Sequence, residues 1–327
     1  MNESYKIAVL GPIPRDHINT YEGIEVEKYG CVLYPVVVCA MLAGPESIII
    51  PVTNIRRIDK APILELLAPF ANVDTSWIND TADRGDVIAL NYVDQNKRLE
   101  RQTGFMNTIG PEDVEGLMDV DAFVFVPVTD FEVALDTLKV IKENSAGVVI
   151  FDAHGPTNTC TRKGERHLRF WIDRDRWLPY IDILKMNLEE AACSWFQNEY
   201  DPEEIEKERE MRMDELPRFA EHCLAQGVKA LYVTLDEYGC AVYYNGPDGK
   251  LEEHFVKRVR VDKVVDTTGC GDSFAGGLAI GYLKTKDYVK ACQYGNAVGA
   301  QRCCGTDLAI YKPLAETEQQ ILETYGS

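Results

Sequence analysis

The chain has 327 residues, and its 53 acidic against 34 basic side chains give a formal net charge of −19. Since nucleic acids and anionic lipids repel such a surface, this excess of negative charge argues against a nucleic-acid or membrane partner. The length accommodates one large α/β domain with an insertion, or two modest domains.

Cysteine spacing and hydrophobic stretches indicate a cytoplasmic protein. None of the ten cysteines forms a Cys-x-x-Cys pair, and the adjacent Cys303 and Cys304 are poorly spaced for zinc, so reduced thiols are expected. The chain leads directly into a strand-like segment, 7–10, with no room for a signal peptide. The longest uncharged stretch, 29–45, is too short to span a membrane comfortably.

Short apolar runs bounded by glycine, proline or polar residues predict strands, and apolar residues three and four apart predict helices. The expected strands are 6–10, 46–51, 87–92, 97–103, 122–127, 147–151, 181–186, 230–235, 241–244 and 253–256. The expected helices are 35–43, 61–70, 131–143, 213–225, 273–283, 287–302 and 317–325. Strands that alternate with helices predict a mainly parallel sheet covered on both faces. A turn at 94–96 would close a hairpin, and the densely charged run 201–215 suggests no function.

The most informative segment is Asp-Thr-Thr-Gly-Cys-Gly-Asp, residues 266–272. An extended stretch, 251–265, precedes it and a helical pattern follows it, so two glycines stand in a tight turn where a helix begins. The free N–H groups of a helix N-terminus attract anions, and Asp272 lies on the same turn. Such a cradle beside a carboxylate suits phosphoryl transfer, whereas the simpler alternative is an ordinary capped helix after a glycine turn.

This segment resembles the second signature of the PfkB (ribokinase-like) carbohydrate kinases. The resemblance implies an α/β, ribokinase-like fold with a mainly parallel central sheet, helices on both faces and a small β lid. Residues 1–327 would form one kinase domain, and segments 13–33 and 87–103 would form the lid. The implied reaction transfers the γ-phosphate of ATP to a hydroxyl of a small sugar, polyol or nucleoside. By the same resemblance Asp272 is the catalytic base, and the amides of Gly269, Cys270 and Gly271 form the anion hole.

Asn187 and Glu190 follow an expected strand and open a helix, where ligands collect in open α/β sheets. An amide and a carboxylate one turn apart suit Mg²⁺, and they resemble the Asn-x-x-Glu motif with which the family places Mg²⁺ and the phosphates. The alternative is a helix cap with its box partner. Asp266 and Thr268 match positions that bind a monovalent cation in some members, so the resemblance adds K⁺ as a further cofactor.

The nucleotide side of the resemblance is less complete. Thr234 and Gly239 match a segment that borders the nucleotide in the family, but Asp236 replaces its middle glycine. That replacement puts close backbone approach to a phosphate in doubt, and a plain strand-turn-strand is the alternative. Asn296 matches an asparagine of the family's adenine pocket, and its alternative is a polar residue on the last core helix.

The acceptor side departs most from the family. Asp16 fits the aspartate that binds substrate hydroxyls, and Gly30 retains the first glycine of the following segment. Cys31 replaces the second glycine, and Tyr34 or Pro35 stands where an asparagine is usual, so the pocket should be bulkier and less polar. Arg101, on the expected hairpin, could reach an anionic group or lie at the surface. The resemblance also suggests a homodimer formed through the lid.

Four alternatives compete with the kinase interpretation. Residues 271–274 superficially match GDSL-type hydrolases, but all five histidines precede Ser273. A P-loop is absent from the sequence, and a dinucleotide fingerprint fits poorly because Phe274 occupies its third glycine position. The alternative from another class is a catalytically weak ligand-binding or regulatory protein on the same scaffold. Within the kinase reading, Cys270 at a helix N-terminus suggests sensitivity of phosphate binding to thiol oxidation.

Overall fold

The computed structural model describes residues 4–20, 22–93, 98–196 and 211–326. The predicted turn at 94–96 and residues 201–210 of the charged run lie outside these ranges. Within them, no helix combines the length and the apolar character needed to cross a bilayer.

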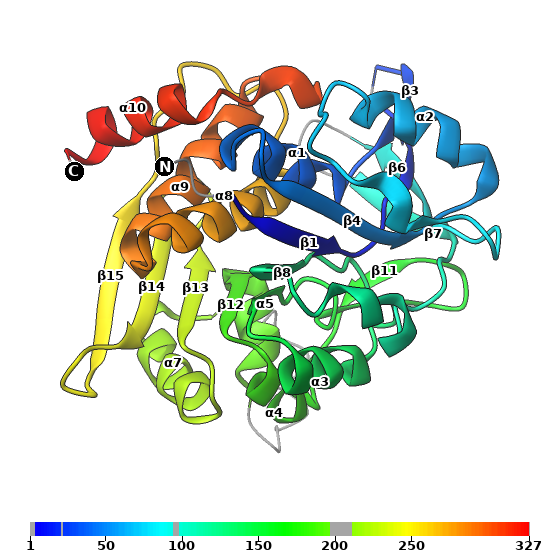
Figure 1. Ribbon diagram of the computed structural model, residues 1–327. Helices are drawn as coiled ribbons and strands as arrows, with labels where there is room; N and C mark the ends of the chain where they lie inside the picture. Colours follow the sequence, from blue (N-terminus) through cyan, green and yellow to red (C-terminus); the bar gives the residue numbers. More distant parts are fainter. Residues whose placement is uncertain (1–3, 21, 94–97, 197–210, 327) are drawn as a thin grey trace.

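The central sheet has nine strands in the order β15-β14-β13-β12-β9-β8-β1-β4-β5 (Figure 1). All neighbouring pairs are parallel except the two that involve β14, which runs antiparallel to both of its neighbours. The strands are β1 (Lys6–Leu10), β4 (Ile48–Asn54), β5 (Ile78–Asn79), β8 (Ala122–Phe125), β9 (Val148–Asp152), β12 (Ile183–Asn187), β13 (Ala230–Thr234), β14 (Gly239–Asn245) and β15 (Leu251–Lys257).

Helices cover both faces of this sheet because its strands are apolar on both sides. Ile7 and Val9 of β1 join one buried cluster, whereas Ala8 and Leu10 join the other. The first cluster packs against α1 (Leu33–Leu42), α2 (Arg57–Leu67), α8 (Cys270–Thr285), α9 (Tyr288–Cys303) and α10 (Leu314–Tyr325). The second packs against α3 (Leu135–Asn144), α4 (Arg174–Trp177), α5 (Leu188–Ser194) and α7 (Leu216–Ala225), on the opposite side in Figure 1. The predicted mainly parallel sheet between two helical layers is therefore confirmed.

Short 3₁₀ helices complete the layers: η1 (Thr75–Trp77), η2 (Pro111–Asp113), η3 (Glu115–Leu117), η4 (Leu178–Tyr180), η5 (Met213–Glu215) and η6 (Leu308–Ile310). Two predicted boundaries were wrong for tertiary reasons. The helix expected at 131–143 begins only at Leu135, because Glu132 and Ala134 instead form backbone hydrogen bonds with Ile109. The extended stretch expected at 251–265 remains a strand only to Lys257, where Asn296 and Tyr325 donate to backbone carbonyls.

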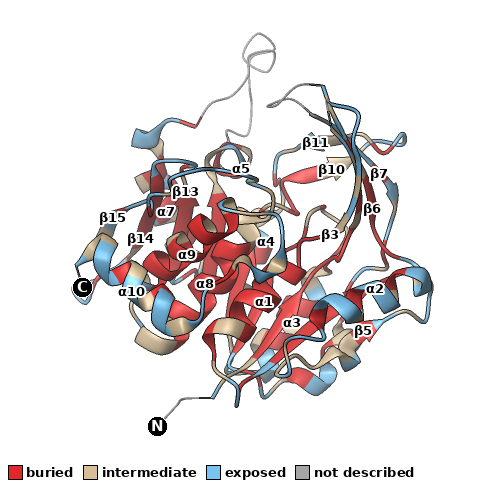
Figure 2. Cartoon of the chain, turned by 90° about the horizontal axis from the view of Figure 1, so that it is seen from above, coloured by how far each residue is buried: buried red, intermediate tan, exposed pale blue. Residues whose placement is uncertain are grey.

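A second sheet, of four strands, begins in the chain shortly after the carboxyl end of β1. Its order is β3-β2-β6-β7, formed by β2 (Arg15–Asn19), β3 (Glu25–Tyr29), β6 (Val87–Tyr92) and β7 (Arg98–Gly104). The pairs β2–β3 and β6–β7 are antiparallel, and β2 pairs with β6 in parallel. We call these four strands the small sheet; Figure 2 shows them standing beside the buried helical core.

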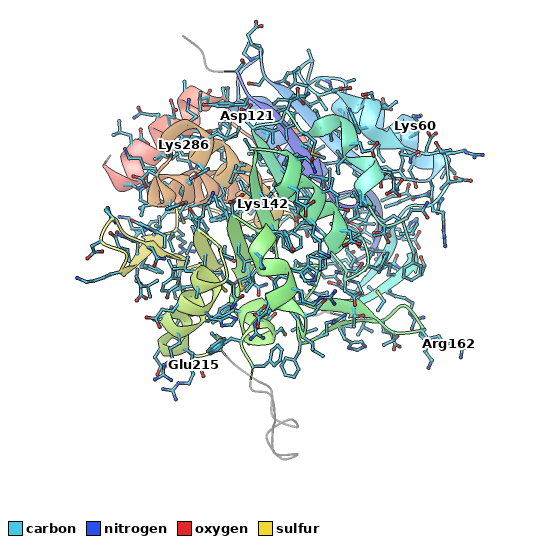
Figure 3. The ribbon with its side chains drawn as sticks, turned by 60° about the horizontal axis from the view of Figure 1, so that its bottom comes forward. Lys60, Asp121, Lys142, Arg162, Glu215 and Lys286 are labelled. Atoms are coloured by element: carbon cyan, nitrogen blue, oxygen red, sulfur yellow. The ribbon has the colours of Figure 1, made fainter. Side chains whose placement is uncertain are left out.

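A hairpin that was not expected from the sequence docks on this small sheet. Strands β10 (Asn158–Cys160) and β11 (Arg166–Leu168) lie beside β7 in Figure 2, and Arg162 marks the outer tip of the hairpin in Figure 3. The amide of Gln102 donates to the carbonyl of Gly164 over 2.7 Å. A Cβ atom at Gly164 would come within 2.1 Å of the carbonyl oxygen of Gln102, so only glycine permits this approach.

Candidate active site

A cavity of about 980 Å³ opens between the small sheet and the carboxyl ends of the parallel strands. This edge is where open α/β sheets hold their ligands. Most of the residues singled out in the sequence line it: Asp16, Asn187, Glu190, Thr234, Gly239, Thr268, Gly269, Cys270, Gly271, Asp272 and Asn296. Gly30, Arg101 and Asp266 are not among its lining residues.

The glycine turn forms the N-terminus of α8, and we call residues 267–271 the anion loop. Gly269 is the N-cap and has a left-handed φ of 81°. A Cβ atom there would lie 2.4 Å from the ring of Tyr34, so backbone conformation and packing both require glycine. The amide of Cys270 donates to the carbonyl of Thr267 over 3.2 Å, which closes the loop. Gly271 follows in the first turn, where helix amides lack carbonyl partners within their own helix.

Asp272 lies in the same turn and is partly exposed to the cavity. Burial among protein atoms raises its pKa above the usual value for an aspartate, and the positive charges of Lys185 and His154 oppose this rise. The thiol of Cys31 lies 3.9 Å from Asp272 Oδ1. Cys31 has φ +48°, so the position of the expected second glycine keeps a left-handed backbone although its residue has changed.

Lys185 is a site residue that sequence reasoning missed. It is only 5% exposed, and its Nζ lies 2.6 Å from Oδ2 of the buried Asp152. A Cβ atom at Gly271 would lie 3.1 Å from that Nζ, so the ammonium sits against the anion loop. Burial acts to lower the pKa of Lys185, but Asp152 and Glu190 outweigh it and raise the pKa, so the charge persists. The available signal was a lysine inside an otherwise apolar strand, two residues before Asn187.

Asn187 and Glu190 form a reciprocal capping box at the start of α5. A helix cap was the alternative to Mg²⁺ binding in the sequence analysis. The Asn187 side chain accepts from the Glu190 amide, and the Glu190 carboxylate accepts from the Asn187 amide, both over 2.8 Å. His154 Nδ1 also lies 2.8 Å from Glu190 Oε1. Burial acts to lower the pKa of His154, but this carboxylate outweighs it and raises the pKa. Because the box faces the cavity, capping and ligand binding are compatible roles for these residues.

Asn187, Glu190 and Asp152, whose side-chain oxygens are potential metal ligands, line this wall of the cavity. Among the described residues, no group of three or more His, Cys, Asp and Glu side chains is arranged to hold a metal ion. Both carboxylate oxygens of Glu190 already accept hydrogen bonds. This set therefore fits Mg²⁺ reached mainly through water and phosphate oxygens, which is the ion's usual mode of binding.

At the acceptor end of the cavity, Asp16 lies opposite Gly30. A Cβ atom at Gly30 would lie 3.3 Å from the ring of Tyr34 and 3.4 Å from Asp16 Oδ2, so both side chains pack close to this glycine. Pro14, Ile88, Leu90 and Val128 add apolar walls at this end.

The arginine that reaches this end is Arg166 of β11, not Arg101. Arg166 donates to Glu100 Oε2 over 3.0 Å and to the carbonyl of Val128 over 2.7 Å. Arg101 is 54% exposed in its side chain and pairs with Glu165 over 3.6 Å. Arg101 therefore lies at the surface, which was the second of its two predicted positions, because the hairpin β10–β11 brings Arg166 to the cavity instead.

A second group of apolar residues lines the cavity, and we call this group the apolar slot. It consists of Val259, Val261, Val264, Phe274 and Ala300, surfaces suited to the faces of a planar base. Gly239, with φ +135°, allows close approach of β15, since a Cβ atom would lie 2.2 Å from the Val256 carbonyl oxygen. Asp236, with φ +47°, keeps the left-handed backbone of the glycine that it replaces. Asn296 uses its amide group to hold the end of β15.

Asp266 is engaged by protein cations rather than left open for a metal ion. Its carboxylate accepts from Arg302 Nη2 over 3.1 Å, from the Thr268 amide over 2.9 Å and from Lys28 Nζ over 3.4 Å. Arg302 is fully buried and lies over the ring of Tyr34, 4.9 Å from its centroid. The guanidinium thus supplies the positive charge at the position where the resemblance implies K⁺.

The sequence model described as "pfkB family carbohydrate kinase" matches residues 148–312. An uncharacterised sugar kinase of Archaeoglobus fulgidus is 40% identical over 82 residues, which are 25% of this chain and 30% of that protein. The 2-dehydro-3-deoxygluconokinase of Bacillus subtilis is 40% identical over 81 residues, which are 25% of this chain and 24% of that protein. The aligned segments therefore span less than a third of these curated relatives.

Structural similarity extends over nearly the whole chain. The structure of Arabidopsis thaliana ribokinase complexed with ribose and ATP superimposes with a TM-score of 0.74 and covers 98% of this chain and 99% of the ribokinase chain. Sequence identity to it is 15%. At this identity the likeness establishes the fold, and the chemistry has to be argued from the cavity itself.

Proposed function

Because the chain belongs to the pfkB family of carbohydrate kinases, we propose that it transfers the γ-phosphate of ATP to a hydroxyl of a small sugar, polyol or nucleoside. The observation that carries this proposal is the meeting of Asp272, Lys185 and the anion loop in one cavity that also contains Asp16. A carboxylate, an ammonium and a helix N-terminus around one point are the groups that phosphoryl transfer needs.

Asp272 is proposed as the base that accepts the proton of the acceptor hydroxyl. Its raised pKa makes the carboxylate a stronger proton acceptor than an ordinary aspartate. The positive charges of Lys185 and His154 oppose the rise in pKa and favour the ionised carboxylate. The acceptor oxygen would then be directed at the phosphate held by the loop in the same helical turn.

The anion loop and Lys185 are proposed to bind the transferring phosphate from two sides. Amides at the start of α8 donate hydrogen bonds, and the Lys185 ammonium adds a full charge beside Gly271. Asn187 and Glu190 would hold Mg²⁺ through water, and the ion would neutralise the phosphates of ATP as they approach. The apolar slot with Asn296 and Thr234 would receive the base and sugar of the nucleotide.

The acceptor is proposed to bind between Asp16 and Arg166, beneath the small sheet. An ionised aspartate accepts two hydroxyl hydrogen bonds, which suits a polyol. The apolar residues Ile88 and Leu90 of the small sheet would cover the acceptor and exclude water, which protects ATP from hydrolysis. Dimerisation through the small sheet, implied by the resemblance, remains a prediction.

The test measures ADP release from Mg-ATP over a panel of sugars, polyols, sugar acids and nucleosides. In a parallel series it measures orthophosphate release from pyrophosphate, a donor that lacks the base. Asp272→Asn should lower kcat by roughly 10²- to 10⁴-fold for the active acceptor. Asp248→Asn is the matched control, since Asp248 is an exposed aspartate outside the cavity. Turnover that survives Asp272→Asn would contradict the assigned base.

A catalytically weak binding protein is the second candidate, motivated by Cys31 and Tyr34 in the acceptor region. Calorimetric titration of ATP and of acceptors separates the two functions. A binder would hold its ligand equally well in Asp272→Asn and the wild type, with no ADP formed by either protein. An enzyme would lose turnover in the variant while it still binds ATP.

A further inference from the structure

Two cysteine thiols meet beside the anion loop. Cys270 is the first residue of α8 and Cys303 the last residue of α9, and their sulfur atoms lie 3.1 Å apart. Both residues line the cavity, so a small solute that enters it can reach them. The proposed kinase chemistry uses neither thiol.

Cys303 also holds the chain that leads into the anion loop. Its carbonyl accepts the amide of Val265 over 2.7 Å and that of Asp266 over 3.4 Å. The neighbouring Cys304 is exposed, and its thiol is directed to the Ala300 carbonyl over 3.3 Å. Of these two adjacent cysteines, only Cys303 contacts Cys270.

We propose that Cys270 and Cys303 form a reversible disulfide when the protein meets a hydroperoxide, and that this bond switches off phosphate binding at the anion loop. The two cysteines then form a site of oxidative modification, at which the two thiols supply two electrons and the peroxide accepts them. The formation of the bond is independent of the proposed kinase activity, whereas its effect on turnover rests on that function.

The reaction balances with peroxide as the only oxidant. The two sulfurs lie 3.1 Å apart, and this contact lowers the pKa of Cys303 and raises that of Cys270, which favours Cys303 as the attacking thiolate. It attacks one peroxide oxygen, the O–O bond breaks, and Cys303 becomes a sulfenic acid as hydroxide leaves. Cys270 then attacks that sulfur and gives up its proton, the S–O bond breaks, and water leaves. Two thiols and one hydrogen peroxide thus give one disulfide and two waters.

The geometry explains why this bond would disturb the site. A disulfide holds its sulfurs about 2.05 Å apart, so the two sulfurs must approach by about 1 Å from their present contact. Part of that movement falls on the backbone of Cys270, at the first turn of α8. Displacement of a positioning group by about 1 Å can reduce catalysis on the order of 10²-fold.

The experiment treats the reduced full-length protein with hydrogen peroxide and then maps its peptides by mass spectrometry without reduction. We expect a crosslink between the peptides of Cys270 and Cys303, with the loss of two hydrogen atoms from the intact mass. The crosslink should be absent from Cys303→Ser and present in the neighbouring control Cys304→Ser. Binding of ATP, measured in parallel by calorimetry, should weaken at least tenfold on oxidation and recover with dithiothreitol.

The outcomes separate the parts of the proposal. A crosslink that forms and leaves ATP affinity unchanged would overturn the switch. Oxidation without this crosslink, for example to sulfinic acid at Cys303, would overturn the disulfide. A protein that transfers phosphate to no acceptor would contradict the proposed function, but the peptide map and the ATP titration would still decide the modification.

Discussion

Replacement of Lys185 by methionine is the sharpest test of the site, because methionine has a side chain of similar length that carries no charge. The structure puts Lys185 Nζ against Gly271, within reach of a phosphate on the anion loop. Two charges about 4 Å apart at an effective dielectric of about 20 interact by about 4 kcal/mol. Loss of most of that energy from the transition state would lower kcat roughly 10²- to 10³-fold.

The same change also affects stability, and the assay must separate the two effects. Lys185→Met leaves the buried Asp152 without its cation, which costs about 3 to 5 kcal/mol if the carboxylate stays charged. Burial already raises the pKa of Asp152 to about 6, although Lys185 acts to lower it. The double variant Lys185→Met with Asp152→Asn removes the stranded charge and should recover most of the stability, but not the turnover.

A lysine–aspartate pair outside the cavity supplies the matched control. Lys142, labelled in Figure 3, lies 2.5 Å from the buried carboxylate of Asp182, which Lys229 also contacts over 2.8 Å. Lys142→Met should lower the free energy of unfolding, measured by urea titration, and leave kcat unchanged. A stable Lys185→Met, Asp152→Asn protein with kcat within threefold of the wild type would refute the phosphate contact assigned to Lys185.

The pH dependence of turnover gives an independent readout of the same charge. The proposed base, Asp272, can accept a proton only when ionised, so kcat should fall as the pH drops through the pKa of its carboxyl. Burial raises that pKa above 3.8, and Lys185 opposes the rise. The acid limb of the kcat profile should therefore move to higher pH in Lys185→Met, whereas an unmoved limb would exclude electrostatic contact between the two groups.

The other predictions concern the loop, the cation and the acceptor. Gly269→Ala should lower the free energy of unfolding by about 3 kcal/mol, from left-handed backbone strain and overlap with Tyr34, and Tyr34→Ala in the same chain should recover part of it in a urea titration. Exchange of K⁺ for choline should leave kcat unchanged because Arg302 already pairs with the carboxylate of Asp266; a severalfold loss would contradict this. Arg166→Met should raise the acceptor KM about tenfold or more, whereas Arg101→Met should not. Equal KM values for these two variants would show that the hairpin arginine does not bind the acceptor.

Interactions between near neighbours in the chain were accessible from the sequence. Alternation of apolar runs predicted the parallel sheet and both helical layers, because strand and helix periods are properties of a few consecutive residues. The capping box of Asn187 and Glu190 spans four residues, and the anion loop at the start of α8 spans five, so each motif carries its own geometry. The hairpin β10–β11 was missed although Gly164, with φ +79°, provides a turn signal between its strands.

The sequence by itself determined the strand and helix order, the anion loop with Asp272, and the family to which they point. Only the tertiary structure decided which distant residues meet at the cavity. It places Lys185 against Gly271 and brings Arg166, in place of Arg101, to the cavity. It also pairs Arg302 with Asp266 and brings Cys303 into contact with Cys270. Each of these contacts joins residues more than thirty positions apart or selects between two neighbouring elements. Such contacts depend on strand order and on how helices and hairpins dock, which are set by burial of the whole apolar surface and not by any local pattern.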